Sequence, residues 1–302
     1  MSKPIAAAMG PLFGTAGLSD SYKKQGNKNM LAVPRFTAAM GLTAFEYQCG
    51  RGVRLAAATA EVLAREGQKE GVRYSLHAPY YISMSSMEEE KRLASTRYIL
   101  QSARAVRALG GSRVIFHPGA CGRQTRQQAM EKAKDTLARM LYALEEEGLA
   151  EEVVLCPETM GKMAQLGTLQ EVLELCGTNP RVLPCIDFGH LNARTGGGIK
   201  TRRDYADILA QMQQTLQDDR ARFFHAHFSK IEYTAGGEKC HLTFADTTFG
   251  PEFEPLLELC AEQGLGPTFI CESAGTQAED AAAMQRYYAA LGRPCGGRRQ
   301  NE

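Results

Sequence analysis

The sequence predicts an α/β fold, a single (β/α)8 barrel of the TIM type, and three observations carry this prediction. Eight short apolar segments recur along the 302 residues, and each is followed by a longer segment with helical spacing. Strict alternation of strand and helix implies parallel strands, and about 38 residues per repeat fits a βα unit. Eight is the number of strands that closes a TIM barrel. A doubly wound open sheet is the alternative fold.

The elements follow from local patterns. The expected strands are short apolar runs at 12–14, 44–48, 73–77, 113–117, 153–158, 182–187, 223–228 and 268–272. The expected helices carry apolar residues every three or four positions, at 34–40, 54–67, 88–109, 126–147, 169–176, 202–216, 251–263 and 277–291. Because no linker divides the chain, we expect one domain over 1–302, with a core at about 12–291, long loops at 195–198 and 235–237, and a polar tail at 296–302.

The charge of the chain is nearly balanced. Lys+Arg 35 against Asp+Glu 34 gives +1, so any binding of a polyanion has to come from a local site. Nine cysteines without a C-x-x-C pair, and an N-terminus without a long apolar stretch, predict a reduced, cytoplasmic protein. No segment approaches the ~18 apolar residues of a membrane span. We expect a monomer that needs neither a membrane nor a protein partner.

Residues that bind metals gather at the ends of the expected strands. All six histidines lie at or just beyond such an end: His77, His117, His190, His225, His227 and His241. Three carboxylates do the same: Glu158, Asp187 and Glu272. These ends converge on one face of a barrel, where its active sites lie. Imidazole and carboxylate suit Zn²⁺, and Mn²⁺ or Fe²⁺ less strongly, and the number of donors implies two or three ions.

Six motifs occur in a characteristic order: H-A-P-Y at 77–80, H-P-G at 117–119, P-E-T-M-G at 157–161, C-I-D-F-G-H at 185–190, H-A-H-F-S-K at 225–230 and C-E-S at 271–273. In order and spacing they resemble the endonuclease IV family of apurinic/apyrimidinic endonucleases, from about residue 12 to about residue 290. The resemblance implies a TIM barrel with three zinc ions that hydrolyses the phosphodiester 5′ to an abasic site during DNA repair.

The resemblance also implies a role for each donor. A first zinc would be held by His77, His117 and Glu158. Glu158 would bridge to a second zinc, completed by Asp187, His225 and Glu272, and a third would be held by His190 and His241. The first two ions would activate the attacking water, so catalysis would depend on His77, His117, Glu158, Asp187 and Glu272.

Two positions near the expected metals depart from the family. The family supplies an Asp-x-His pair to the third metal, whereas Lys239 stands here where the Asp is expected. Glu238 could replace it after a shift of one residue, Cys240 could ligate, or Lys239 could supply positive charge in place of a weakly held ion. His227 stands where the family usually has an amide. It is interpreted as an extra ligand, as a hydrogen-bond partner behind the ligands, or as a phosphate contact.

Contacts to DNA are expected from Tyr80 at the abasic pocket, from Gln48 and Arg51 in the loop after the second strand, and from Lys230. A packing role for Tyr80 and a solvated basic loop are the alternatives.

Two other functions also remain open. One is a divalent-metal sugar isomerase or epimerase on the same barrel. The other is a relative that binds abasic DNA but has weakened catalysis.

Overall fold

The computed structural model describes residues 10–296 and confirms the (β/α)8 barrel. Its parallel strands are β1 (Leu12–Ala16), β2 (Ala44–Gln48), β3 (Arg73–His77), β4 (Arg113–Phe116), β5 (Val154–Pro157), β6 (Cys185–Asp187), β7 (His225–Phe228) and β10 (Thr268–Cys271). They pair in the order β5-β4-β3-β2-β1-β10-β7-β6. The remaining seam between β5 and β6 is joined by hydrogen bonds from Leu183 N to Leu155 O and from Thr159 N to Cys185 O, both 3.0 Å. The sheet therefore closes on itself.

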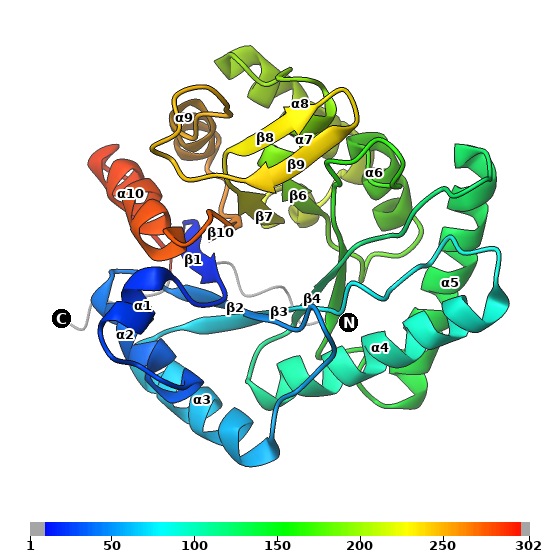
Figure 1. Cartoon of the computed structure of the whole chain (residues 1–302), viewed down its shortest axis with the longest axis horizontal. Coiled ribbons are helices and arrows are strands. Elements are labelled where there is room, and N and C mark those ends of the chain that lie inside the picture. Colours follow the sequence, from blue (N-terminus) through cyan, green and yellow to red (C-terminus); the bar gives the residue numbers. More distant parts are fainter. Residues whose placement is uncertain (1–9, 297–302) are drawn as a thin grey trace.

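The helices surround the strands as an outer ring (Figure 1). They are α1 (Asp20–Lys24), α2 (Val33–Ala39), α3 (Ala57–Glu70), α4 (Glu89–Ala108), α5 (Arg126–Glu146), α6 (Leu169–Gly177), α7 (Phe188–Arg194), α8 (Arg202–Leu216), α9 (Glu254–Gln263) and α10 (Gln277–Ala290). Short 3₁₀ turns lie at Met30–Ala32 and Asp219–Ala221. Thr125 and Thr168 begin α5 and α6 with capping boxes, in which the cap hydroxyl and the side chain three residues later satisfy exposed N–H groups. Among the described residues, no helix is long and apolar enough to cross a membrane.

Two strands and two short helices lie outside the expected pattern. The hairpin of β8 (Ile231–Thr234) and β9 (Gly237–His241) replaces the loop that we expected around 235–237. It lies beside α7 above the β6–β7 side of the barrel (Figure 1). The short helices α1 and α7 were also not expected. The predicted polar tail lies outside the described residues except for Gly296, whose N–H donates to the Pro11 carbonyl at 3.0 Å.

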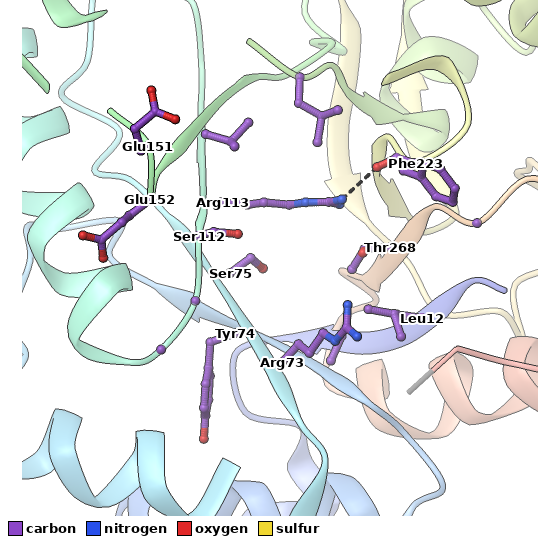
Figure 2. A pocket seen from close by; sticks show the side chains of 16 residues that line it. Leu12, Arg73, Tyr74, Ser75, Ser112, Arg113, Glu151, Glu152, Phe223 and Thr268 are labelled. Carbon is purple, nitrogen blue, oxygen red and sulfur yellow. Dashed lines mark hydrogen bonds between the residues drawn. The ribbon is translucent and has the colours of Figure 1, made fainter. Parts of the chain in front are cut away.

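The N-terminal end of the barrel, opposite the end where the metals are expected, contains a cavity of about 360 Å³. It is lined by the first residues of six strands, namely Leu12, Ala44, Arg73, Arg113, Val154 and Thr268. The Arg113 side chain extends across it and donates to the carbonyls of Phe223 at 2.8 Å and Phe224 at 3.3 Å (Figure 2). Burial and the charge of Arg73 lower the pKa of Arg113. The buried Arg113 side chain therefore spans the end of the barrel that is remote from the expected metals.

Candidate metal centre

Glu158 lies at the centre of the candidate site, directly after β5, and its side chain is buried. Its Oε2 lies 3.1 Å from His77 Nε2 and 3.4 Å from His117 Nε2. Nδ1 of His77 lies 2.9 Å from the Ala78 carbonyl, to which it donates when Nε2 is the unprotonated nitrogen. The donor atoms of these three residues lie within 4.8 Å of one another, as expected for a metal site. The structure thus brings His77, His117 and Glu158 together.

Asp187 and His190 owe their placement to the helix that follows β6. Asp187 is the N-cap of α7, and its Oδ1 accepts from the backbone N–H of His190 at 2.7 Å. This three-residue spacing is that of an N-cap and its partner on the first helical turn. The other oxygen, Oδ2, is buried without a hydrogen-bond partner. His190 Nδ1 lies 3.2 Å from this oxygen without hydrogen-bond geometry, and a buried carboxylate oxygen that lacks a hydrogen bond fits a cation.

The second donor group consists of Glu158, Asp187, His227 and Glu272, with donor atoms again within 4.8 Å. Nδ1 of His227 lies 3.3 Å from Glu158 Oε1 and 3.7 Å from Glu272 Oε2. Three carboxylates and one imidazole meet here. Such a set suits a divalent cation with mixed N and O ligands.

The expected role of His225 needs a correction, because His227 occupies the position beside Asp187 and Glu272. Both histidines face into the barrel, as strand alternation predicts, but they differ in depth. His225 is the first residue of β7. Residues two apart on a strand differ by about 6.6 Å along it, so only one can reach the rim. His225 lies a layer deeper, with Nε2 2.9 Å from Glu46 Oε2 and Nδ1 3.5 Å from Arg113.

A third donor group adjoins the first two and consists of His190, Glu238 and His241. Oε2 of Glu238 lies 3.3 Å from His190 Nε2, and Oε1 lies 4.0 Å from His241 Nε2. Each imidazole is held by its other nitrogen: His190 Nδ1 lies 3.0 Å from the Thr159 carbonyl, and His241 Nδ1 lies 2.8 Å from Ser229 Oγ. Such contacts orient imidazole ligands in metalloproteins. Of the substitutes considered for the missing Asp, Glu238 is the residue that the structure brings to this position.

A bulge in the hairpin explains how Glu238 reaches its place. Residues three apart on a regular strand face opposite sides. Here Glu232 pairs with Cys240 and Tyr233 pairs with Glu238, which leaves Lys239 without a partner in the ladder. The extra residue restores the same facing for Glu238 and His241. Lys239 projects outward, and its Nζ lies 2.6 Å from Glu232.

Two glycines allow the hairpin to approach the loop after β5. A Cβ at Gly161 would lie 2.6 Å from Glu238 Cβ and 3.0 Å from the His190 ring. Gly237 has φ +92 and approaches the Gly161 carbonyl so closely that a Cβ would overlap it. The Gly of the P-E-T-M-G motif thus leaves space for two members of the third donor group.

Glu46 is a buried acidic residue that was not expected at the site. It lies in the middle of β2, fully inside the barrel, where its carboxylate receives hydrogen bonds from His225, Ser75 and Gln48. Burial alone would raise its pKa, but the charge of His227 and the hydrogen bonds from the histidines hold it well below the usual range. Glu46 shares one face of its strand with Ala44 and Gln48, the residues two positions before and after it. A charged residue on the face of a strand that points into the barrel is the sequence signal that could have revealed it.

The electrostatics of the rim favour positive charge. Burial would raise the pKa of Glu158, but the charge of His227 and hydrogen bonds from His117 and His190 keep it well below the usual range. Burial would lower the pKa of His190, yet the charges of Asp187 and Glu158 raise it to about 10. In the chain alone, protons supply the positive charge that these carboxylates require. Divalent cations would compete with those protons for the same donors.

The four residues expected to contact DNA separate into two kinds. Tyr80 is 59% exposed, and its ring stacks on His117 at 5.3 Å between centroids. Arg51 is exposed in the loop after β2, next to Gly50, whose carbonyl accepts from the Tyr80 N–H at 3.2 Å. Gln48 instead donates to Glu46 at 3.1 Å, inside the barrel. Lys230 is buried and bound to Glu252 Oε1 at 2.6 Å and to the Asp246 carbonyl at 2.7 Å, so its expected DNA contact is wrong.

Comparison with known proteins places the chain in a family. A family model described as a xylose isomerase-like TIM barrel matches residues 34–289. The chain belongs to the xylose isomerase-like TIM barrel family. An uncharacterized protein of Methanocaldococcus jannaschii is 32% identical over 276 residues, which cover 91% of this chain and 96% of that protein. A probable endonuclease 4 of Mycoplasma pneumoniae is 28% identical over 160 residues, which cover 51% of this chain and 52% of that protein.

Solved structures share the fold at low identity. Endonuclease IV from Thermus thermophilus superposes with a TM-score of 0.68 at 21% identity, covering 93% of this chain and 98% of that one. A D-tagatose 3-epimerase-like protein also gives 0.68, at 19% identity, covering 93% and 97%. The fold alone therefore does not separate nuclease from epimerase. The aligned part also spans only about half of the endonuclease 4 relative named above. The resemblance to the endonuclease IV family is confirmed at the level of family, and the reaction has to be argued from the site.

Proposed function

We propose that this chain is a metal-dependent phosphodiesterase that cleaves DNA on the 5′ side of an abasic site. The observation that carries this proposal is the set of three adjoining donor groups at the rim. Two of them share Glu158. Their residues come from six barrel strands or the segments after them and from the hairpin β8–β9. Adjoining metal ions suit phosphodiester hydrolysis, because they can stabilise both the attacking and the leaving oxygen.

The donor set fits Zn²⁺. His77, His117 and Glu158 would hold one ion, Glu158, Asp187, His227 and Glu272 a second, and His190, Glu238 and His241 a third. Bound there, the ions would supply Lewis-acid stabilisation of the charge that develops on the phosphate. They also add the positive charge that a chain of net +1 lacks, so the phosphate would be attracted locally.

Side chains outside the donor groups would position the DNA. Tyr80 presents an exposed ring beside His117, and Arg51 lies on the neighbouring loop. An aromatic face next to the reacting phosphate suits a nucleotide that has lost its base, since the ring can occupy the space that the base leaves. Gly50 makes this possible, because a Cβ there would lie 2.6 Å from the Tyr80 ring.

A sugar epimerase is the second candidate, and the pair Glu158 and Glu272 favours it. Their carboxylates share one donor group with a buried histidine between them. Two carboxylates at a metal site can remove and return a proton on opposite faces of a sugar. The third donor group, formed by His190 of α7 and two hairpin residues, has no evident use in that reaction, and for this reason we place phosphodiester cleavage first.

The deciding experiment uses the full chain loaded with Zn²⁺. A duplex with one abasic site, labelled at either end, is incubated beside an intact duplex of the same sequence, and a ketohexose is assayed in parallel. We expect cleavage of the abasic strand alone, with a product that ends in a 3′-hydroxyl. Binding of abasic DNA without a product would indicate the catalytically weakened relative. Epimerisation without cleavage would replace the proposal by the second candidate.

A further inference from the structure

Glu46 lies beneath the rim and is a member of none of the three donor groups. Its two carboxylate oxygens face four polar groups. Oε2 accepts from Ser75 Oγ and His225 Nε2, each at 2.9 Å, and Oε1 accepts from Gln48 at 3.1 Å and lies 3.1 Å from His227 Nε2. Glu46, Ser75 and both histidines are buried, so water does not compete for these contacts.

His227 lies between this carboxylate and the rim. Its Nδ1 faces Glu158 at 3.3 Å and Glu272 at 3.7 Å, whereas its Nε2 faces Glu46. A neutral imidazole carries one proton, so the nitrogen that donates and the nitrogen that can bind a metal are different atoms. If Nε2 carries the proton toward Glu46, Nδ1 offers its lone pair to the second donor group.

His225 supports Glu46 from below in a consistent way. Its Nε2 donates to Glu46 at 2.9 Å, and its Nδ1 is positioned to accept from Arg113 at 3.5 Å. Both nitrogens of His225 are thereby used. This argues against a metal held by Cys185, His225 and His227, although their donor atoms lie within 4.8 Å of one another. Hydrogen bonds link Arg113 through His225 to Glu46, and an ion-pair contact of 3.1 Å joins Glu46 to His227.

We propose that Glu46 is a positioning residue that fixes the tautomer and ring orientation of His227, so that Nδ1 faces the second donor group. The proposal rests on the metal centre of the proposed function but not on its substrate. Carboxylates behind histidine ligands commonly have this role, and their loss typically lowers metal affinity by about 10- to 100-fold. Glu46 acts through His227 and does not itself contact a substrate.

The test compares the chain with its Glu46→Gln variant, which keeps the shape of the side chain and removes its charge. Zn²⁺ affinity is measured by competition with a chelator, and Co²⁺ is titrated by its visible absorption. Nitrogen-15 NMR of the Zn²⁺-loaded chain reports which nitrogen of His227 is protonated. We expect about 10- to 100-fold weaker Zn²⁺ binding in Glu46→Gln and loss of the single Nε2-protonated form.

A double-mutant cycle separates positioning from a general effect on the fold. If Glu46 acts through His227, Glu46→Gln has little further effect on affinity in a His227→Gln background. Cys185→Ala is the matched control, since Cys185 is buried on β6 level with His225, and we expect the Zn²⁺ affinity of this variant to stay within about twofold of the parent.

Three results would overturn the proposal. They are an unchanged tautomer in Glu46→Gln, an equal loss of affinity in both backgrounds, and an absence of divalent-metal binding by the parent chain. Failure of the proposed function looks different. A chain that binds Zn²⁺ in a Glu46-dependent way but leaves abasic DNA uncut would refute the nuclease and keep the positioning role.

Discussion

The two ends of the barrel hold opposite kinds of polar residue. At the C-terminal rim, carboxylates and imidazoles crowd together and leave Asp187 Oδ2 without a hydrogen bond, 3.2 Å from His190 Nδ1. At the N-terminal end, Arg113 spans a cavity and donates to two backbone carbonyls. The rim is an arrangement that needs a cation, whereas the other end already contains one with its hydrogen bonds made. The same inward-facing positions of one sheet therefore serve binding at one end and structure at the other.

The largest effect should come from Glu158→Gln at the rim. Losing the charge shared by two donor groups should lower abasic-site cleavage by roughly 10³-fold or more, or about 4 kcal/mol, with the fold retained. Zinc content and single-turnover cleavage would measure it. Glu171→Gln is the control, because this glutamate pairs with Arg126 at 2.7 Å and lies outside the donor groups. Full activity in Glu158→Gln would show that Glu158 is not a ligand shared by two donor groups.

The stability of the fold should depend on pH through His225, which lies between the two ends of the barrel. Burial, despite the charge of Glu46, lowers the pKa of His225 to about 4, against about 6.5 when unfolded. Between these pH values His225 binds a proton in the unfolded chain but not in the folded chain. The free energy of unfolding therefore falls as pH falls, by about 3 kcal/mol in total. Urea unfolding of metal-free protein from pH 7 to 4 should show this loss, and His225→Gln should lack it. Parallel pH curves for the two proteins would contradict the assignment.

Arg113→Met should affect stability and leave the rim intact. It would leave the buried carbonyls of Phe223 and Phe224 without their donor, at a cost of about 1–3 kcal/mol in the free energy of unfolding. Denaturant melts would measure this cost, and elemental analysis would measure zinc. Loss of zinc together with stability would show that the two ends are more strongly coupled than we infer.

Glu238→Ala and Lys239→Ala form a matched pair on the hairpin. Glu238 faces His190 and His241, so its loss should weaken the third ion by about 10-fold or more, seen as a lower zinc content after dialysis. Lys239 is exposed and pairs only with Glu232, so its removal should leave the zinc content unchanged and cost at most about 1 kcal/mol. The opposite outcome would identify Lys239 as the functional residue of the pair.

The smallest effect on cleavage should come from Tyr80, and it should distinguish this residue from its neighbour Tyr81. Tyr80 and Tyr81 are exposed to 59% and 55%, but Tyr80 stacks on His117 and Tyr81 packs against Tyr98. Tyr80→Ala should lower kcat/KM for abasic duplex by about 10-fold, or about 1.4 kcal/mol, and Tyr81→Ala should change it by less than about twofold. Equal effects would mean that Tyr80 has only a packing role.

The sequence was sufficient for the barrel and for much of the rim. Alternation of strands and helices is a local signal, and the ends of parallel strands converge by geometry alone, which is how the nine donors could be placed at one rim in advance. The grouping of His77, His117 and Glu158 on one ion came from the resemblance to the endonuclease IV family. Depth within the barrel is not a local signal. The two-residue period placed His225 and His227 on one face, but only the register with β6 and β10 shows which of them reaches the rim.

Other features that the sequence did not predict also depend on contacts between residues distant in the chain. Glu46 was overlooked because its partners come from β3 and β7, which are distant in sequence. Lys230 looked like a surface cation, but Glu252 and the Asp246 carbonyl, which lie after the hairpin, bury it. The hairpin itself was interpreted as a loop because its strands are short and rich in polar residues. In each case, a contact with a residue remote in the chain decided the outcome.

The bulge at Lys239 has a consequence for how such sites change over time. A strand that gains one residue normally turns every later side chain to the other face, so an insertion between two ligands would be expected to destroy their site. Here the ladder absorbs the added residue at one point, and the ligand face continues beyond it. The spacing between ligands can therefore vary while their geometry persists, and a search by fixed motif spacing would pass over relatives whose sites are intact.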